Sequence, residues 1–237
     1  MRNTFAIAWK EGKLYFTTPA AYIVGAMFLV LTGIFFVEAV TLPFAEASVR
    51  SLVTRASFLL IFLSPLLTMR LLAEEQKLGT LELLLTAPVR DWEVVIGKYI
   101  ASFVVMIAML ALTSYYVLLL YWFGSPDTGP MFSAYLGLIL YGAATLAIGL
   151  MASSLSGNQI VAAAVGIATL LTLSFIGQVG NIVSGVAAQV MDGLSLNAHF
   201  LDFTRGIIDT SNVVYYISIT AVFLFLTVRS LETRRWR

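Results

Sequence analysis

The 237-residue sequence contains no cysteine, a single histidine and few charged residues, with 14 basic and 13 acidic side chains. The absence of cysteine excludes disulfides, thiolate metal sites and cysteine nucleophiles. Charged residues make up 11% of the chain, whereas they make up roughly a quarter of an ordinary soluble domain. The net charge of +1 gives no indication of a nucleic-acid partner.

What the sequence has instead is apolar surface: 59% of its residues are hydrophobic, and the mean hydropathy is +0.92. Such a chain is neither a water-soluble globule nor intrinsically disordered, because it could not leave this much apolar surface in water. The composition therefore predicts an all-α, polytopic membrane protein.

Six stretches are long and apolar enough to cross a bilayer, which takes roughly 20 residues of helix. They are expected at about 20–40, 52–72, 94–122, 132–155, 159–176 and 213–228. The third is longer than a bilayer requires and should tilt or protrude. No separate soluble domain fits in the remaining sequence, so residues 1–237 are expected to form one membrane domain.

The distribution of Lys and Arg predicts the orientation of these spans. Eleven basic residues fall on the side that carries both termini, and the other side has Arg50, Arg55 and Arg205. Because Lys and Arg concentrate on the cytoplasmic side of a membrane, both termini are expected in the cytoplasm. The protein is accordingly expected to be a multi-pass membrane protein.

Residues 1–17 precede the first span and have the pattern of an amphipathic helix. Phe5, Ala8, Trp9, Gly12, Tyr15 and Phe16 recur at helical spacing, and Lys10 and Lys13 fall on the opposite face. This pattern predicts a helix that lies in the inner interface with its aromatic face toward the membrane. A positively charged anchor without a functional role is the alternative.

The cytoplasmic segment between the second and third spans is expected to form a short helix over about 74–87. Leu78, Leu81, Leu84 and Leu85 make one apolar stripe, and Pro88 ends the helix. A helix this short is marginal alone, so its stripe should lie on the membrane surface, on the bundle or in a groove of a partner protein. The alternative is a solvated connector with some interfacial leucines.

On the outer side, residues 180–210 are expected to form an amphipathic element at the outer interface. Gly177 and Gly180 should break the fifth span, and an apolar helical pattern follows. The residues of interest in this element are His199, Phe200, Phe203, Arg205, Gly206 and Asp209. A hydrophobic plug and a passive interfacial loop are both compatible with the pattern.

The sequence offers little for catalysis or for ion-coupled transport. A lone His199 with scattered carboxylates is weak evidence for a metal site or a general base, and no GxxxxGK[ST] phosphate loop is present. The pair Glu74–Glu75 lacks the further arginine and histidines that intramembrane proteases need. The centres of the six spans carry no ionisable residue, whereas ion-coupled carriers place one there. A bundle without internal charge must therefore draw its energy from elsewhere or do no transport work.

The run EEQKLGTLELLLTAP at residues 74–88, followed by Gly97 and Lys98, resembles the cytoplasmic signature of type-two ABC exporter permeases, E-x-x-x-G-T-L-E-x-L-L-x-x-P. The six spans, the N-terminal interfacial helix and the outer element also match that family. Residues 199–209 and 229–237 resemble the gliding-motility, GldF-like branch.

The resemblance implies a permease subunit that catalyses no reaction and binds no cofactor, with ATP and Mg held by a partner ATPase. Its coupling helix would contact that ATPase through Glu74, Glu75, Lys77, Gly79, Thr80, Leu81, Glu82, Leu83 and Leu84. The implied partners are two copies of a cytoplasmic ABC ATPase, a second permease copy in a homodimer, a GldG-like auxiliary membrane protein and membrane lipid. A membrane scaffold that transmits force without a substrate pathway is the alternative function.

Overall fold

The computed structural model describes residues 2–41, 50–80, 89–123, 127–180 and 185–235. Within these ranges the regular elements are helices and no strand is present. The helices are α1 (Arg2–Thr17), α2 (Pro19–Thr41), α3 (Arg50–Lys77), α5 (Asp91–Phe123), α6 (Thr128–Leu155), α7 (Gln159–Gly180), α8 (Val186–Leu194), α9 (Leu196–Thr204) and α10 (Thr210–Arg235).

Six of the described helices are long and apolar enough to cross a membrane: α2, α3, α5, α6, α7 and α10. This confirms the all-α, polytopic class predicted from composition. Each span expected from the sequence lies inside one of these helices. The third, α5, has 33 residues, which at about 1.5 Å per residue is longer than the roughly 30 Å of hydrocarbon.

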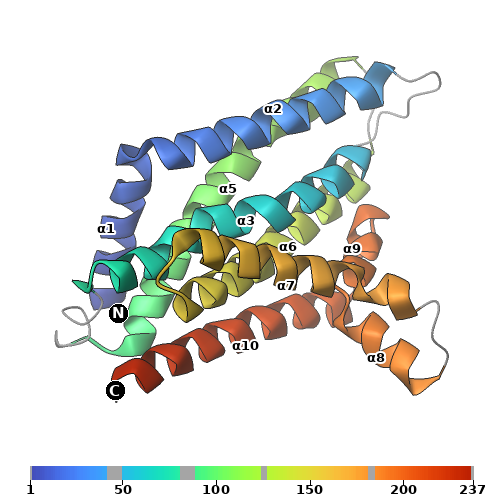
Figure 1. The fold of residues 1–237 in the computed structure, drawn as a ribbon. Helices are drawn as coiled ribbons and strands as arrows, with labels where there is room; N and C mark the ends of the chain where they lie inside the picture. Colours follow the sequence, from blue (N-terminus) through green and yellow to red (C-terminus); the bar gives the residue numbers. More distant parts are fainter. Residues whose placement is uncertain (1, 42–49, 81–88, 124–126, 181–184, 236–237) are drawn as a thin grey trace.

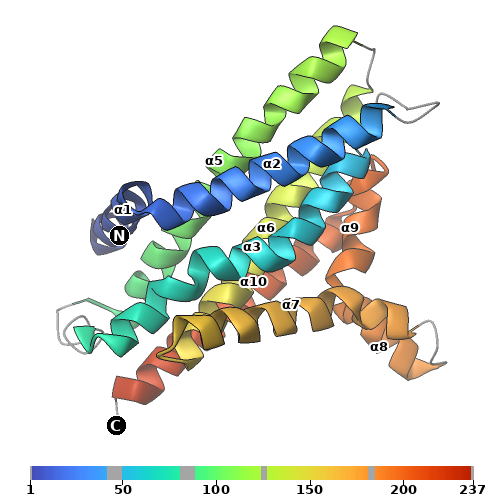
Figure 2. The same cartoon turned by 45° about the horizontal axis from the view of Figure 1, so that its top comes forward.

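Consecutive spans run in opposite directions, so both termini lie at the same end of the bundle (Figure 1). That end also carries α1, the last turns of α3 and the first turns of α5. The short helices α8 and α9 lie at the other end, beside the start of α10 (Figures 1 and 2). Helix α1 turns away from α2 and lies across this end of the bundle (Figure 1).

Helices α3 and α6 form the centre of the bundle. In each of them 72% of the apolar window is buried, compared with 11% in α2 and 17% in α10. The two helices approach closely at Gly149, where an added Cβ would lie 2.3 Å from Thr68 Oγ1. The hydroxyls of Ser64 and Thr145 share a buried hydrogen bond of 2.8 Å. Small and hydroxyl-bearing residues therefore hold this pair together, as is typical of helices packed in a membrane.

The helix expected over about 74–87 is not a single element. Residues 74–77 form the last turn of α3, and the described chain then turns at Leu78 and Gly79, where Gly79 has φ +70°. Only glycine adopts this left-handed conformation without cost, which is why a helix so often ends just before one. Residues 81–88, including Leu81, Glu82, Leu83 and Leu84, lie outside the described residues.

The outer segment also differs from the expectation. Helix α7 continues through Gly177 and ends at Gly180, so Gly177 does not break the fifth span. Its missing side chain serves packing, because an added Cβ would lie 2.9 Å from Ser195 Cβ. The described residues of 180–210 form two helices, α8 and α9, which meet at Ser195. The Ser195 hydroxyl caps α9 by accepting from the Ala198 amide at 3.3 Å.

Candidate functional site

A buried ion cluster joins three helices at the end of the bundle that carries both termini. The side chain of Lys98, on α5, is only 1% exposed. Its Nζ donates to Glu11 Oε1 of α1 at 2.9 Å and to Glu75 Oε1 of α3 at 2.8 Å. One buried ammonium group thus holds together the interfacial helix, the end of the second span and the start of the third.

The sequence around Lys98 allows α1 to approach α5 closely. An added Cβ at Gly97 would lie 2.8 Å from Ile7 Cγ2 and 3.0 Å from the Thr4 carbonyl oxygen. Glycine is therefore the residue that fits where the two helices touch. This contact brings Glu11, one turn after Ile7, to the ammonium group of Lys98.

Tyr15, one of the residues expected on the membrane-facing side of α1, instead lies on the buried face of this helix together with Glu11. Glu11 and Tyr15 are both 5% exposed, whereas Phe5 and Trp9 are 71% and 61% exposed. The Tyr15 hydroxyl donates to the Leu67 carbonyl oxygen of α3 at 2.6 Å, and burial raises the pKa of its phenol above the usual value. Phe5, Trp9 and Phe16 remain available to lipid, and Tyr15 belongs to the packed side.

A second contact fixes α1 to the first turn of α5. The buried carboxylate of Glu93 accepts from the Arg90 amide at 3.1 Å and from Asn3 Nδ2 at 3.4 Å. The first of these bonds satisfies an amide at the start of α5, as in a capping box. Glu93 therefore both caps α5 and binds the N-terminal end of α1.

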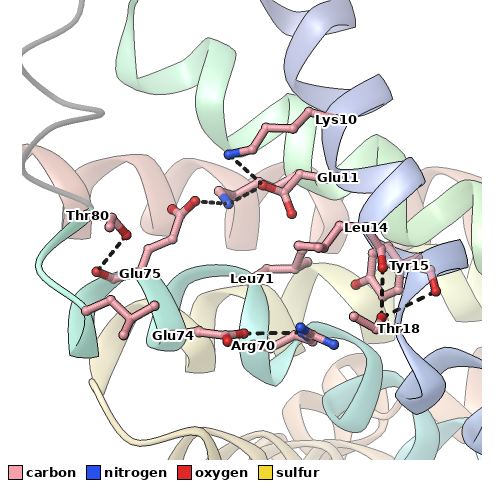
Figure 3. A pocket seen from close by; sticks show the side chains of 12 residues that line it. Lys10, Glu11, Leu14, Tyr15, Thr18, Arg70, Leu71, Glu74, Glu75 and Thr80 are labelled. Carbon is pink, nitrogen blue, oxygen red and sulfur yellow. Dashed lines mark hydrogen bonds and ion pairs between the residues drawn. The ribbon is translucent and has the colours of Figure 1, made fainter.

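A pocket of about 500 Å³ opens beside the ion cluster, between α1 and the end of α3 (Figure 3). Within it, Arg70 Nε lies 3.3 Å from Glu74 Oε2, and Lys10 Nζ lies 4.0 Å from Glu11 Oε1. The lining combines these charges with an apolar floor and comprises Lys10, Glu11, Leu14, Tyr15, Thr18, Arg70, Leu71, Glu74, Glu75, Leu78, Thr80 and Lys98.

The described residues of the expected ATPase-contacting segment have different surroundings. Glu75 turns inward to Lys98, and Glu74 pairs with Arg70. Lys77, Gly79 and Thr80 are exposed, and Thr80 Oγ1 lies 3.4 Å from the Glu75 carbonyl oxygen. Glu75 therefore belongs to the buried ion cluster, whereas Lys77, Gly79 and Thr80 lie on the surface.

The six residues singled out in the outer element do not form one site. Phe200 and Phe203 are buried, and Gly137 of α6 leaves room for Phe203, whose Cβ would lie 2.5 Å from an added Cβ. His199 stacks on Tyr215 with ring centroids 3.8 Å apart. Arg205, Gly206 and Asp209 are exposed. Phe200 and Phe203 therefore anchor α9, and Asp209 caps α10 by accepting from the Ser211 amide at 2.8 Å.

Glu11 is the member of the ion cluster that sequence reasoning missed, and Lys98 was singled out only as part of the family signature that follows residues 74–88. The available signal was a carboxylate between the aromatic positions of an interfacial helix. An acid there is expensive unless it is paired. Within the described part of the chain, no group of three or more His, Asp or Glu side chains could hold a metal ion.

The fold and this site define a class of protein: a six-span helical membrane protein with a buried ion cluster at the end of the bundle that carries both termini. The family model described as "ABC-2 family transporter protein" matches residues 44–228. The chain belongs to the ABC-2 transporter family and is a permease subunit of an ABC transporter. The match includes Glu75 and Lys98 and begins after α1. A comparison with curated proteins gives no match.

Proposed function

We propose that this permease couples ATP hydrolysis by a cytoplasmic ABC ATPase to the movement of a substrate across, or out of, the bacterial cytoplasmic membrane. Family membership supports an ATPase partner. Both termini would lie in the cytoplasm, because the end of the bundle that carries them also carries eleven of the 14 basic residues. ATP and Mg would be bound by the ATPase, and this chain would catalyse no reaction itself.

The main support for the proposal is the buried hydrogen bond between Glu75 and Lys98. The segment from Leu78 to Arg90 leaves the end of α3 and returns at the start of α5. Both helices are joined just above it by the buried bond between Glu75 and Lys98. An ATPase that pushes on this segment would therefore move α3 and α5 together, and Glu11 would carry the motion to α1.

The resemblance to type-two ABC exporters supports the finer assignments. The segment around Glu82 would contact the ATPase, and two ATPase copies would serve two copies of this permease, which would form a homodimer. The similarity of residues 199–209 and 229–237 to the gliding-motility branch favours a GldF-like permease with a GldG-like auxiliary membrane protein.

Co-expression of the chain with a candidate ABC ATPase partner tests the proposal. The two proteins should co-purify, and Glu82→Lys should weaken the association about tenfold or more, as expected for a reversed charge in a protein interface. The matched control is Glu232→Lys, which reverses a carboxylate on α10 at the same end of the bundle. It should leave the association unchanged.

Two results would contradict the proposal. If Glu82→Lys leaves both assembly and ATP turnover intact, this segment does not couple the two proteins. If ATP turnover of the reconstituted complex does not respond to lipids, lipoproteins or polysaccharides, the chain is a scaffold that transmits force without a substrate pathway.

A further inference from the structure

Helix α3 has a buried proline, Pro65, inside its membrane-spanning part. Proline has no N–H, so it cannot donate to the Ile61 carbonyl oxygen, and its ring bends the helix at this point. An added Cβ at Gly149 of α6 would lie 3.3 Å from Pro65 Cα, and one at Gly166 of α7 would lie 3.0 Å from Pro65 Cβ. Both neighbouring helices therefore lack a side chain where they contact the proline.

A side chain of α6 enters the backbone ladder of α3 shortly after Pro65. The Ser153 hydroxyl accepts from the Leu72 and Ala73 amides at 3.2 and 3.1 Å. It also donates to the Met69 carbonyl oxygen at 2.9 Å. Met69 and Ala73 are four residues apart, so their carbonyl and amide groups are a pair that an unbroken α-helix joins directly. A side chain that inserts into this ladder is one of the known causes of a helix bend.

Two more side chains bind the backbone of α3 in the same stretch. Thr68 Oγ1 donates to the Ser64 carbonyl oxygen of its own helix at 2.9 Å, which is a bond that often bends a helix. The Tyr15 hydroxyl of α1 donates to the Leu67 carbonyl oxygen at 2.6 Å. Side-chain partners of this kind satisfy backbone groups where a helix ladder is interrupted inside a membrane. Residues 65–73 are therefore the part of α3 that can change its bend at the least cost.

The end of α3 beyond this stretch belongs to a different set of contacts. Glu75 binds Lys98 of α5, which also binds Glu11 of α1. Residues 74–77 are thus connected to α1 and α5, whereas an earlier part of α3 is bound to α6 through the hydroxyl of Ser64. A change of bend between these two parts would move them relative to each other.

We propose that residues 65–73 of α3 form a hinge and that the Ser153 hydroxyl is the partner that holds it bent. When α3 straightens, the Ala73 amide binds the Met69 carbonyl oxygen directly and Ser153 is released. The end of α3 then moves away from α6 together with α1 and α5. The link between this motion and ATP rests on the proposed function, whereas the hinge is a property of this chain alone.

A disulfide can report the position of the hinge, because the chain has no cysteine of its own. An added Cβ at Gly157, just after α6, would lie 3.8 Å from Gln76 Cβ at the end of α3. This is the usual separation of the Cβ atoms in a disulfide. The purified full chain with Gln76→Cys and Gly157→Cys should therefore cross-link on oxidation while α3 is bent. The loss of maleimide-reactive thiols with time measures the rate.

Removing the Ser153 hydroxyl should shift the hinge toward the straight state. In the double-cysteine chain, Ser153→Ala should slow cross-linking about tenfold, because hydrogen bonds between α3 and α6 are lost. The matched control is Ser154→Ala, whose hydroxyl donates within its own helix, to the Met151 carbonyl oxygen at 2.7 Å. It should leave the rate unchanged. Equal rates for the two variants would overturn the proposal.

A second measurement leaves the hinge residues intact, so it applies even where Ser153→Ala fails to fold. The oxidised double-cysteine chain should still co-purify with a candidate ABC ATPase partner. Its ATP turnover should fall about tenfold on oxidation, within the usual range of coupling between sites, and should return on reduction. Undiminished turnover in the oxidised complex would overturn the proposal.

The two measurements separate the hinge from the proposed function. If the reduced double-cysteine chain and the wild type both fail to bind the ATPase, the proposed coupling is wrong. The cross-linking rates of the chain alone then decide the hinge, because they need no ATPase.

Discussion

The ammonium group of Lys98 lies 2.8 Å from Glu75 Oε1 and connects two helices that the chain otherwise joins only through residues 78–90. Glu75 is in the last turn of α3, and Lys98 is in the third turn of α5. The bond closes the segment between α3 and α5 into a loop with fixed ends. Force applied to such a loop reaches both helices, which is the property that a permease driven from outside the membrane requires.

Replacing Lys98 with methionine should strongly destabilise the fold. The substitution keeps the length of the side chain but leaves the carboxylates of Glu11 and Glu75 buried without their ammonium group. Breaking a buried pair in this way costs about 3–5 kcal/mol. Thermal unfolding of the purified protein measures the loss. Lys13→Met, at an exposed position of α1, should change little, and an unchanged midpoint for Lys98→Met would refute the importance of the cluster.

Gly149→Ala should separate the central pair of helices. An added Cβ would lie 2.3 Å from Thr68 Oγ1, 3.3 Å from Pro65 Cα and 3.4 Å from the Ser64 carbonyl oxygen. Overpacking of this kind costs about 1–3 kcal/mol, which unfolding in denaturing detergent can measure. The matched control is Gly193→Ala in α8, where nothing lies within 4 Å of an added Cβ. Equal stability of the two variants would contradict the close contact between α3 and α6.

Tyr15 should make the stability of the protein fall at high pH. Burial raises the pKa of Tyr15 above its usual 10.0, so the folded protein keeps a proton that the unfolded chain releases above pH 10. The contribution is fully present below pH 10 and is lost at about 1.4 kcal/mol per pH unit as the pH rises toward the folded pKa.

The variant Tyr15→Phe removes this contribution, so its stability should decline less steeply between pH 10 and 11. It should also lose about 1 kcal/mol at neutral pH with the hydrogen bond to Leu67. The control Thr17→Ala, at an exposed neighbouring position, should retain the wild-type slope. Identical slopes for Tyr15→Phe and the wild type would show that the phenol is not buried.

The absence of cysteine makes the orientation directly measurable with single cysteines. Ser211 and Thr233 are exposed residues near opposite ends of α10. In intact cells, a membrane-impermeant maleimide should label Ser211→Cys and should label Thr233→Cys only after permeabilisation. The reverse pattern would place both termini outside the cytoplasm, and the cysteine-free wild type is the control for background labelling.

The spans were predictable from the sequence because length and apolar content alone determine whether a helix can cross a bilayer. The end of α3 was predictable in part. Lys77 in the last turn and Gly79 just beyond it are signals for the end of a helix, but the leucine periodicity across residues 78–85 favoured one longer element. The helix α3 ends before Gly79 because this residue has a left-handed backbone conformation, with φ +70°, which glycine adopts without strain.

The ion cluster was not predictable from local patterns. Glu11 and Lys98 are 87 residues apart, and no periodicity connects an interfacial helix with the third turn of a later span. Gly97 and Gly177 show the same limit. In the sequence Gly97 is part of a family signature and Gly177 is a predicted helix breaker, and only the neighbouring Ile7 and Ser195 reveal that close packing requires both glycines.

The distance along the chain between Glu11 and Lys98 also affects biosynthesis. At about 5–20 residues per second, the ribosome adds Lys98 about 4 to 17 s after Glu11, given their separation of 87 residues. Until Lys98 has been added, Glu11 and Glu75 lack the ammonium group that pairs with both of them in the folded protein. The contact that joins α1, α3 and α5 can therefore form only after the ribosome has made the start of the third span.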